Sequence, residues 1–186
     1  PDDISMDEQF DAICGITEKE LKGYFAQSIE EMSAKLKCSS EELKEKLKKN
    51  YDGYHFSEAM LDIYNPFSIL NAFKKKKIED YWYESGTPTY LEKLMEGHKV
   101  NMQKLIGRSY ARKYFIDYRA DKEEPLAMLY QSGYLTIKGY DSRRRVYKLD
   151  YPNDEVRKGF VSLIGNNYFH KPSEENANWI LEMDDM

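Results

Sequence analysis

The sequence predicts a mainly helical α+β fold, in which a helical bundle with a small hairpin precedes a helix, a β-hairpin and a last helix. Two observations support this prediction. Helix-start patterns followed by apolar residues every three or four positions recur between residues 17 and 106. Residues 125–160 then join a helical pattern to two β-prone stretches and a second helical pattern, which is the element order of a winged-helix-like unit.

The first part of the chain begins with two capped helical patterns. Thr17 with Glu20 has the form of a capping box, and the apolar stripe behind it predicts one long helix over residues 17–37. Ser39 with Glu42 repeats the capping pattern and predicts a second, shorter helix. The two helices are expected to form a helical hairpin.

Turn and cap residues organise the next stretch. Residues 51–56 read YDGYHF, and the Asp-Gly pair predicts a tight turn within a small hairpin. Asn65 can cap a helix over residues 66–75, because Pro66 at its first position needs no N–H partner. A Thr-Pro pair predicts a further helix over residues 87–97.

The winged-helix-like unit is marked out in the same way. A helix over residues 125–132 is expected to end at Gly133, which can adopt a left-handed conformation. Residues 134–140 and 145–151 are rich in β-branched and aromatic side chains and predict the hairpin. Asn153 is expected to cap the last helix.

These patterns divide the chain into four parts. Residues 1–16 are an N-terminal tail, residues 17–116 the helical portion, and residues 117–169 the winged-helix-like portion. The polar stretch that begins at residue 117 marks the boundary between the last two. Residues 170–186 begin another helix or a linker, which we expect to be truncated.

Composition sets limits on location and partners. With 41% hydrophobic and 33% charged residues and no long apolar run, the chain is expected to be cytoplasmic and to have no membrane partner. Cys14 and Cys38 lack the spacing of a metal or disulfide motif. A net charge of −5 argues against binding of nucleic acid through bulk electrostatics, although local basic runs remain.

Motifs for catalysis are missing from this sequence. It contains no phosphate-binding GxxxxGK(S/T) loop and no GxSxG elbow, and its three histidines are widely separated, so we predict no catalytic residue and no metal site. One alternative stays open, a hydrolase site built from His55, Asp52 and Asp62, which lie close together in the sequence.

A second alternative is a DNA-binding module. A winged-helix unit would read a groove with the helix over residues 125–132 and touch phosphates with its hairpin. That helix offers only Gln131 and Ser132 as polar readers, so binding would depend on the hairpin. The candidate nucleic-acid contacts are Lys138, Arg143, Arg144 and Arg145.

Several longer motifs resemble a family of predicted bacterial AAA-like ATPases that often carry a C-terminal PD-(D/E)XK nuclease-type domain. The motifs extend over nearly the whole chain and are GITEKEL (15–21), YDGYHF (51–56), YNPFSIL (64–70), YWYESGTPTYL (81–91), LYQSGYLTIKGYD (129–141) and YPNDEVRKGF (151–160). In that family they lie downstream of the nucleotide-binding core and upstream of the nuclease-type domain.

The resemblance implies a non-catalytic lid followed by the winged-helix-like unit. The Walker segments are expected before Pro1 and the nuclease motif after Met186, so ATP and Mg²⁺ are implied for the longer parent protein and no cofactor for this chain. In such proteins the lid can offer an arginine to phosphates, and Arg108 and Arg112 are the candidates here. The implied partners are the neighbouring ATPase and nuclease-type domains or another protein.

Overall fold

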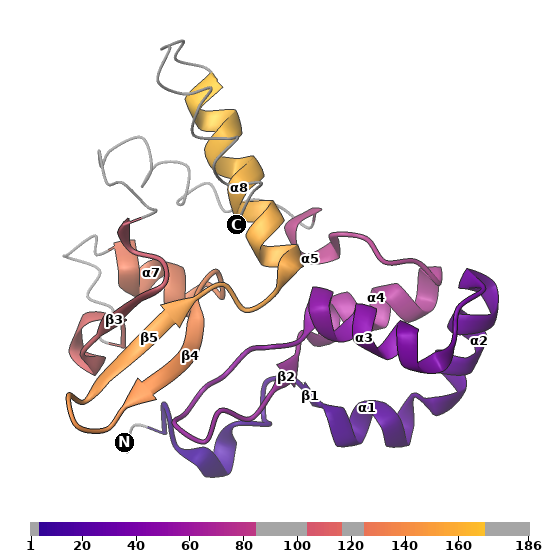
Figure 1. Ribbon diagram of the computed structural model, residues 1–186, viewed down its shortest axis with the longest axis horizontal. Helices are drawn as coiled ribbons and strands as arrows, with labels where there is room; N and C mark the ends of the chain where they lie inside the picture. Colours follow the sequence, from indigo (N-terminus) through magenta and orange to yellow (C-terminus); the bar gives the residue numbers. More distant parts are fainter. Residues whose placement is uncertain (1–3, 85–103, 117–124, 170–186) are drawn as a thin grey trace.

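The structure of the chain is a computed structural model that describes residues 4–84, 104–116 and 125–169. Figure 1 shows a group of helices at one end of the molecule and a small sheet at the other, with the last helix beginning between them. The mainly helical α+β class predicted from the sequence is confirmed.

Within the described residues, four helices form most of the helical end, and three of them begin at the predicted caps. Both capping boxes are formed, at Thr17 with Glu20 and at Ser39 with Glu42. The Asn65 side chain accepts hydrogen bonds from the backbone N–H groups of Phe67 and Ser68. The helices are α1 (Glu18–Tyr24), α2 (Ala26–Leu36), α3 (Ser40–Tyr51) and α4 (Pro66–Lys75).

The prediction of one long helix over residues 17–37 is wrong, because the chain forms the two helices α1 and α2 there. Phe25 separates them with non-helical dihedral angles, φ −114° and ψ 17°. Its ring stacks on Phe73 with centroids 5.4 Å apart. Both helices turn their apolar sides to one core, so apolar residues keep their helical spacing in the sequence across the break at Phe25. That spacing therefore could not reveal the break.

A buried apolar cluster holds the helical end together. Its members come from α1 to α4, from the strand before α4 and from the short helix α5 (Tyr81–Glu84). The cluster consists of Leu21, Ile29, Met32, Leu43, Leu47, Tyr51, Tyr64, Ile69, Ala72, Phe73 and Tyr81.

The small hairpin differs from its prediction in position. Strand β1 (Ile16–Thr17) pairs antiparallel with β2 (Ile63–Tyr64), and Tyr54 forms a single bridge with Ile63. The chain therefore reverses between residues 55 and 62 and not at Asp52 and Gly53. Gly53 does have a positive φ, +90°, but it redirects the chain as it leaves α3.

The second end has the predicted order of helix, hairpin and helix. Its elements are α7 (Pro125–Gln131), β4 (Thr136–Asp141), β5 (Val146–Asp150) and α8 (Asp154–Phe169). Gly133 follows α7 with φ +81°. The Asn153 side chain accepts a hydrogen bond from the N–H of Val156 and caps α8, as predicted.

A third strand joins this sheet from an earlier part of the chain. Strand β3 (Arg108–Tyr110) pairs with β5, which gives the order β3-β5-β4. Phe115, which is fully buried, belongs to the core of the sheet end. Residues 108–115 were predicted as part of the helical portion, and they pack instead with the sheet.

The first two residues of α5 contact the two ends of the molecule. Tyr81 is buried in the helical core, and the Trp82 ring meets the Tyr134 ring edge-on with centroids 4.9 Å apart. The helices predicted over residues 87–97 and from residue 173 lie outside the described residues.

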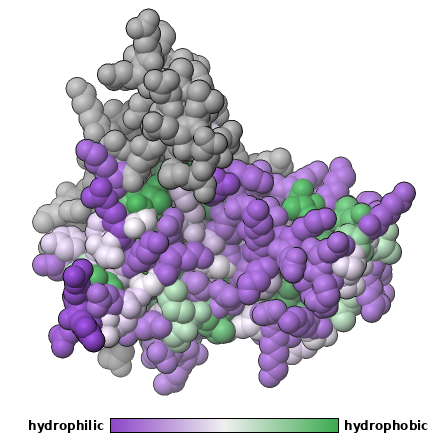
Figure 2. Space-filling view, in the orientation of Figure 1, coloured by the Kyte–Doolittle hydropathy of each residue, from purple (hydrophilic) through white to green (hydrophobic). Residues whose placement is uncertain are grey.

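The surface is largely polar. Figure 2 shows hydrophilic residues over most of one face, with apolar residues in small separate areas. Among the helices in the described ranges, none has the length and hydropathy to cross a membrane.

Candidate functional site

The two ends of the molecule meet through a set of polar contacts that are mostly buried. They join the loop after α3 to the start of β4 and to the residues that open α8. We call this region the junction and define it as residues 52–62, 136–138 and 152–155. It lies between the helical bundle and the hairpin in Figure 1.

The centre of the junction is a reciprocal pair of hydrogen bonds between two backbone segments far apart in sequence. The His55 N–H donates to Thr136 Oγ1 at 2.8 Å, and the same hydroxyl donates to the His55 carbonyl at 2.9 Å. Thr136 is 2% exposed. One threonine hydroxyl thus supplies a hydrogen-bond partner to both the N–H and the carbonyl oxygen of His55, as a neighbouring strand would do.

The His55 ring adds two further contacts. Its Nδ1 lies 2.6 Å from the carbonyl oxygen of Ile137, and its Nε2 lies 2.7 Å from Oδ1 of Asp62. Partial burial acts to raise the pKa of Asp62, but the hydrogen bonds from His55 and Lys48 hold it below its usual value. Because both ring nitrogens face protein oxygens, neither is open to exchange a proton with a substrate.

Asp52 is a buried acid without a strong partner. It is 1% exposed, and neither carboxylate oxygen accepts a hydrogen bond. The nearest ammonium group, Lys48 Nζ, is 3.8 Å from Oδ2 of Asp52 and is closer to Asp62, at 3.1 Å. Burial raises the pKa of Asp52 to about 6 against the lowering effect of the neighbouring Gly53 N–H, which is too poorly placed for a regular hydrogen bond, and the charge of Asp62 acts in the same direction as burial.

Lys138 closes the junction from the hairpin side. Its Nζ donates to the carbonyl oxygens of Gly53 at 2.7 Å and of Pro152 at 2.9 Å. Burial lowers the pKa of Lys138 below its ordinary value. The ammonium group therefore ties the loop after α3 to the segment before α8, in a position where it is partly withdrawn from solvent.

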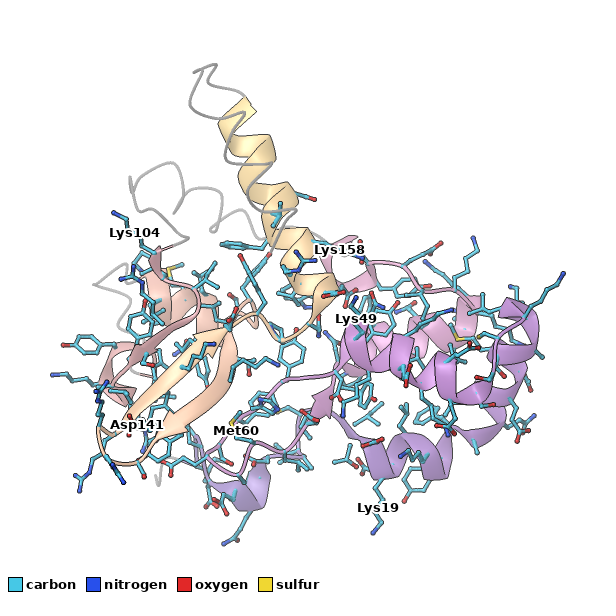
Figure 3. All side chains as sticks on the ribbon, in the orientation of Figure 1. Lys19, Lys49, Met60, Lys104, Asp141 and Lys158 are labelled. Carbon is cyan, nitrogen blue, oxygen red and sulfur yellow. The ribbon has the colours of Figure 1, made fainter. Side chains whose placement is uncertain are left out.

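Glu155 joins α8 to the helical end. Its carboxylate accepts a hydrogen bond from the Ser68 hydroxyl at 2.7 Å and one from the Trp82 N–H at 2.6 Å. The side chain is fully buried, and burial raises its pKa to about 7 against the effect of these hydrogen bonds. Figure 3 shows Lys49 beside the start of the same helix, where its Nζ lies 3.4 Å from Asp154.

The structure brings the three residues of the hydrolase alternative together, but in a form that favours a structural role. His55, Asp52 and Asp62 all line or adjoin a groove of about 560 Å³ between α3 and the hairpin. Both ring nitrogens of His55 are occupied, and Asp52 faces no group that it could activate. In the described ranges, no three His, Cys, Asp or Glu side chains are placed to hold a metal ion.

The proposed nucleic-acid contacts are split between two places. Arg143, Arg144 and Arg145 are exposed at the turn between β4 and β5, where the backbone N–H groups of Arg143 and Arg144 donate to Asp141. Lys138 lies in the junction and is not part of this tip. The polar side chains of the helix before the hairpin are also occupied, with Gln131 donating to Ile116.

The two candidate nucleotide-sensing arginines are exposed on the sheet end. Arg108 lies on the edge strand β3, and Arg112 follows it in a single 3-10 turn. Arg112 donates to the carbonyl oxygen of Ser5 at 3.4 Å.

Sequence reasoning missed two central junction residues, Thr136 and Glu155. Thr136 counted only as a strand former, and Glu155 had the pattern of an ordinary acidic residue in the first turn of a helix. The available indication was weak, since Asp154 is also acidic and lies in the same first turn of α8, and nothing in the sequence sets Glu155 apart from it.

Comparisons with known proteins give one curated relative. Over 175 residues the chain is 29% identical to a protein of Azotobacter chroococcum mcd 1 called "Uncharacterized protein in vnfD 5'region", and the alignment covers 92% of this chain and 31% of that relative. The chain thus spans about a third of the relative's length. No family model and no solved structure matches the chain.

Proposed function

We propose that this chain is a non-catalytic coupling module, the lid and winged-helix-like part of a longer AAA-like ATPase. The sequence motifs support the parentage, and the similarity to about a third of a longer bacterial protein agrees with a parent longer than this chain. The observation that carries the proposal is the junction, where buried polar groups join the two ends of the molecule.

The coupling follows from the cost of separating buried polar groups. If the two ends moved apart, the His55 backbone, Lys138 and Glu155 would each lose partners that the other end supplies. An unsatisfied buried polar group costs about 1–3 kcal/mol. A displacement of the helical end should therefore move the hairpin and α8 with it, because no hinge separates the two ends at the junction.

In this proposal ATP and Mg²⁺ bind to the longer protein and not to this chain alone. Arg108 and Arg112 are the residues of this chain that would reach a phosphate, because their exposed guanidinium groups can donate hydrogen bonds to phosphate oxygens. Their role is to stabilise negative charge and hold the phosphate end of the nucleotide.

Calorimetric titration of the chain with ATP and Mg²⁺ tests the non-catalytic part of the proposal. We expect no binding in the submicromolar range and no hydrolysis. Submicromolar ATP binding by this chain would refute the assignment.

Hydrogen exchange tests the coupling. The Thr136→Val variant keeps the shape of the side chain and removes both hydrogen bonds to His55. We expect faster exchange of amides in α3 and in β4 together, whereas Ser109→Ala on the exposed side of the sheet should change neither. Faster exchange in β4 alone would mean that the two ends are not coupled.

A DNA-binding role is the second candidate, and the exposed arginine tip favours it. The test is a gel shift at several salt concentrations with Arg143, Arg144 and Arg145 all changed to Ala. Binding that weakens steeply with salt and is lost in this variant supports the role. The control variant changes three exposed lysines remote from the tip to Ala, which removes the same amount of charge and should leave binding intact. These lysines are Lys19, Lys46 and Lys74.

A further inference from the structure

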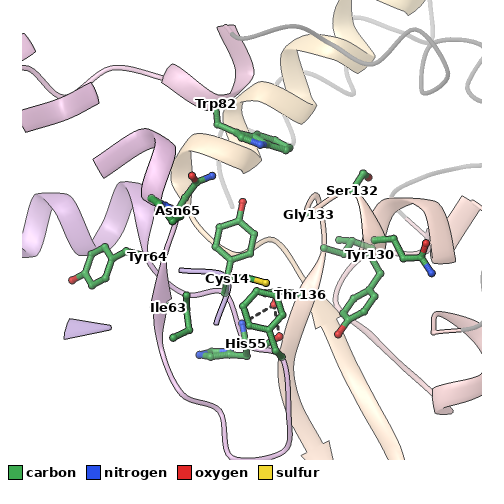
Figure 4. Close-up of a pocket in the computed structure, with 15 residues that line it drawn as sticks. Cys14, His55, Ile63, Tyr64, Asn65, Trp82, Tyr130, Ser132, Gly133 and Thr136 are labelled. Atoms are coloured by element: carbon green, nitrogen blue, oxygen red, sulfur yellow. Dashed lines mark hydrogen bonds between the residues drawn. The ribbon is translucent and has the colours of Figure 1, made fainter. Parts of the chain in front are cut away.

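Two adjoining hollows lie on the side of the molecule where the N-terminal segment meets the sheet end. The first has a volume of about 330 Å³, and Figure 4 shows Trp82 at its top and Tyr130 at its right, with Cys14 near the centre of the view. The second has a volume of about 350 Å³ and lies under the N-terminal segment. Cys14, Phe56, Tyr130 and Gln131 line both hollows, and we call the pair the Cys14 groove.

The walls of the Cys14 groove are mainly apolar. Rings of Trp82, Phe56 and Tyr130 line it, and three large apolar side chains of the N-terminal segment remain in contact with solvent at its second hollow. Ile4 is 51% exposed, Phe10 37% and Ile13 70%. Neighbouring exposed apolar side chains around a concave surface are typical of a site that a partner covers.

One buried polar atom in this groove has no partner. Asp11 lines the second hollow and is 2% exposed. Its Oδ2 accepts a hydrogen bond from the Ser57 hydroxyl, but its Oδ1 accepts none. A carboxylate in this state is best satisfied by a cationic donor from outside the chain, because charge-assisted hydrogen bonds are the strongest available.

The charges around the groove favour the same kind of partner. Asp7 and Glu8 are exposed in the turn before Asp11. Among the described lining residues of the two hollows there is no Lys or Arg. Arg112 lies at the rim, where its guanidinium donates to the carbonyl oxygen of Ser5. The groove thus combines an apolar floor with an excess of negative charge.

We propose that the Cys14 groove binds a peptide segment of a partner protein in which apolar side chains flank one arginine or lysine. The basic side chain reaches Asp11 Oδ1, and the apolar ones cover Ile13 and fill the ring-lined first hollow. This inference rests on the proposed coupling function and deepens it, because it names the face through which the module would engage a partner.

The probe is a pair of fluorescein-labelled peptides, Leu-Phe-Arg-Leu-Phe and the same peptide with Gln in place of Arg. Fluorescence anisotropy with the full chain measures both affinities. We expect the Arg peptide to bind at least fivefold more tightly than the Gln peptide. Equal binding of the two peptides, or binding of neither, would overturn the proposal.

Two acid variants locate the origin of this preference. Asp11→Asn removes the buried charge and should abolish the preference for Arg. Glu8→Gln removes the same charge from an exposed position in the same segment and should retain the preference. If Asp11→Asn still prefers the Arg peptide, Asp11 is not the recognised group and the proposal fails.

A second pair of variants covers the case in which Asp11→Asn does not fold. Ile13→Ser changes a side chain that is 70% exposed, so the fold should be unaffected, and it should weaken the Arg peptide at least fivefold. Leu70→Ser, at a 50% exposed position of α4 outside the groove lining, is the matched control and should bind as the unaltered chain does. Equal affinities of both variants would contradict the proposal.

The two cysteines report where the peptide binds. Cys14 lies in the groove, while Cys38 packs against the helical core. A saturating Arg peptide should slow alkylation of Cys14 and leave Cys38 unchanged. An unchanged Cys14 rate would overturn the assignment of the site.

Self-association of the chain that Ile13→Ser removes would point to a second copy as the occupant. If these tests fail while Thr136→Val still couples α3 to β4, only the docking inference is wrong.

Discussion

Asp52 should lower the free energy of unfolding of this protein as the pH rises from 3.8, the ordinary pKa of Asp, to about 6. The carboxyl group is 1% exposed, accepts no hydrogen bond, and lies at the C-terminus of α3, where the helix dipole disfavours negative charge. Its pKa is raised from 3.8 to about 6. The folded state therefore holds this proton more tightly than the unfolded state does.

The sign and size of the effect follow from proton linkage. Between pH 3.8 and about 6 the folded state binds more protons at Asp52, so the free energy of unfolding falls as the pH rises. At 1.36 kcal/mol per pKa unit the full difference corresponds to about 3 kcal/mol. Buried sites relax and admit water, so we expect about half of this value to be measured.

The assay is urea unfolding of the unaltered chain and of Asp52→Asn from pH 4 to pH 8. Asn cannot ionise, so any fixed cost of its amide appears equally at every pH. We expect the difference between the two proteins to shift in favour of Asp52→Asn by about 1–2 kcal/mol from pH 4 to pH 8. The comparison within one protein pair cancels the effects of other titrating groups.

Asp62→Asn is the matched control, with the opposite sign. The pKa of Asp62 is held down by His55 and Lys48, so its charge stabilises the fold at any pH above the pKa of Asp in the unfolded chain. This contribution is lost as the pH falls through the lowered pKa of the folded state. Asp62→Asn should therefore be less stable than the unaltered chain at pH 7. A difference for Asp52→Asn that does not change between pH 4 and pH 8 would show that Asp52 is ionised at no cost, and the reasoning about its burial would be refuted.

Two further substitutions test the junction by urea unfolding. Glu155→Ala should destabilise the chain by about 3 kcal/mol because it removes the acceptor of the buried Ser68 hydroxyl, whereas Glu155→Gln keeps an acceptor oxygen and should cost about 1 kcal/mol; equal costs would mean that the hydrogen bond contributes nothing. Gly53→Ala should cost at least about 2 kcal/mol, since φ is +90° there and a Cβ atom would collide with the Pro152 carbonyl oxygen; a neutral result would show that this loop can move aside.

The elements of this fold were predictable wherever local chemistry decides them. The capping boxes at Thr17 and Ser39, the Asn65 cap and the end of the helix at Gly133 are all properties of a few neighbouring residues. The break at Phe25 was not predictable, because a bend that keeps both apolar faces on one core leaves the spacing of the sequence unchanged.

The junction could not be derived from the sequence because its partners lie far apart along the chain. His55 and Thr136 are 81 residues apart, and Ser68 and Glu155 are 87 apart. The grouping of His55 with its acidic neighbours was foreseen, but their role was not. Only the fold shows that both ring nitrogens are occupied and that Lys138 turns toward the loop.

The most direct test of the central claim is the distance distribution across the junction. Spin labels at two exposed positions, Lys46 on α3 and Lys148 on β5, would be introduced with Cys14 and Cys38 replaced by Ser. Pulsed electron spin resonance should give one narrow distance distribution, which broadens when Thr136 is changed to Val. A broad or two-peaked distribution in the protein with an intact junction would contradict the account, because the two ends would then move independently.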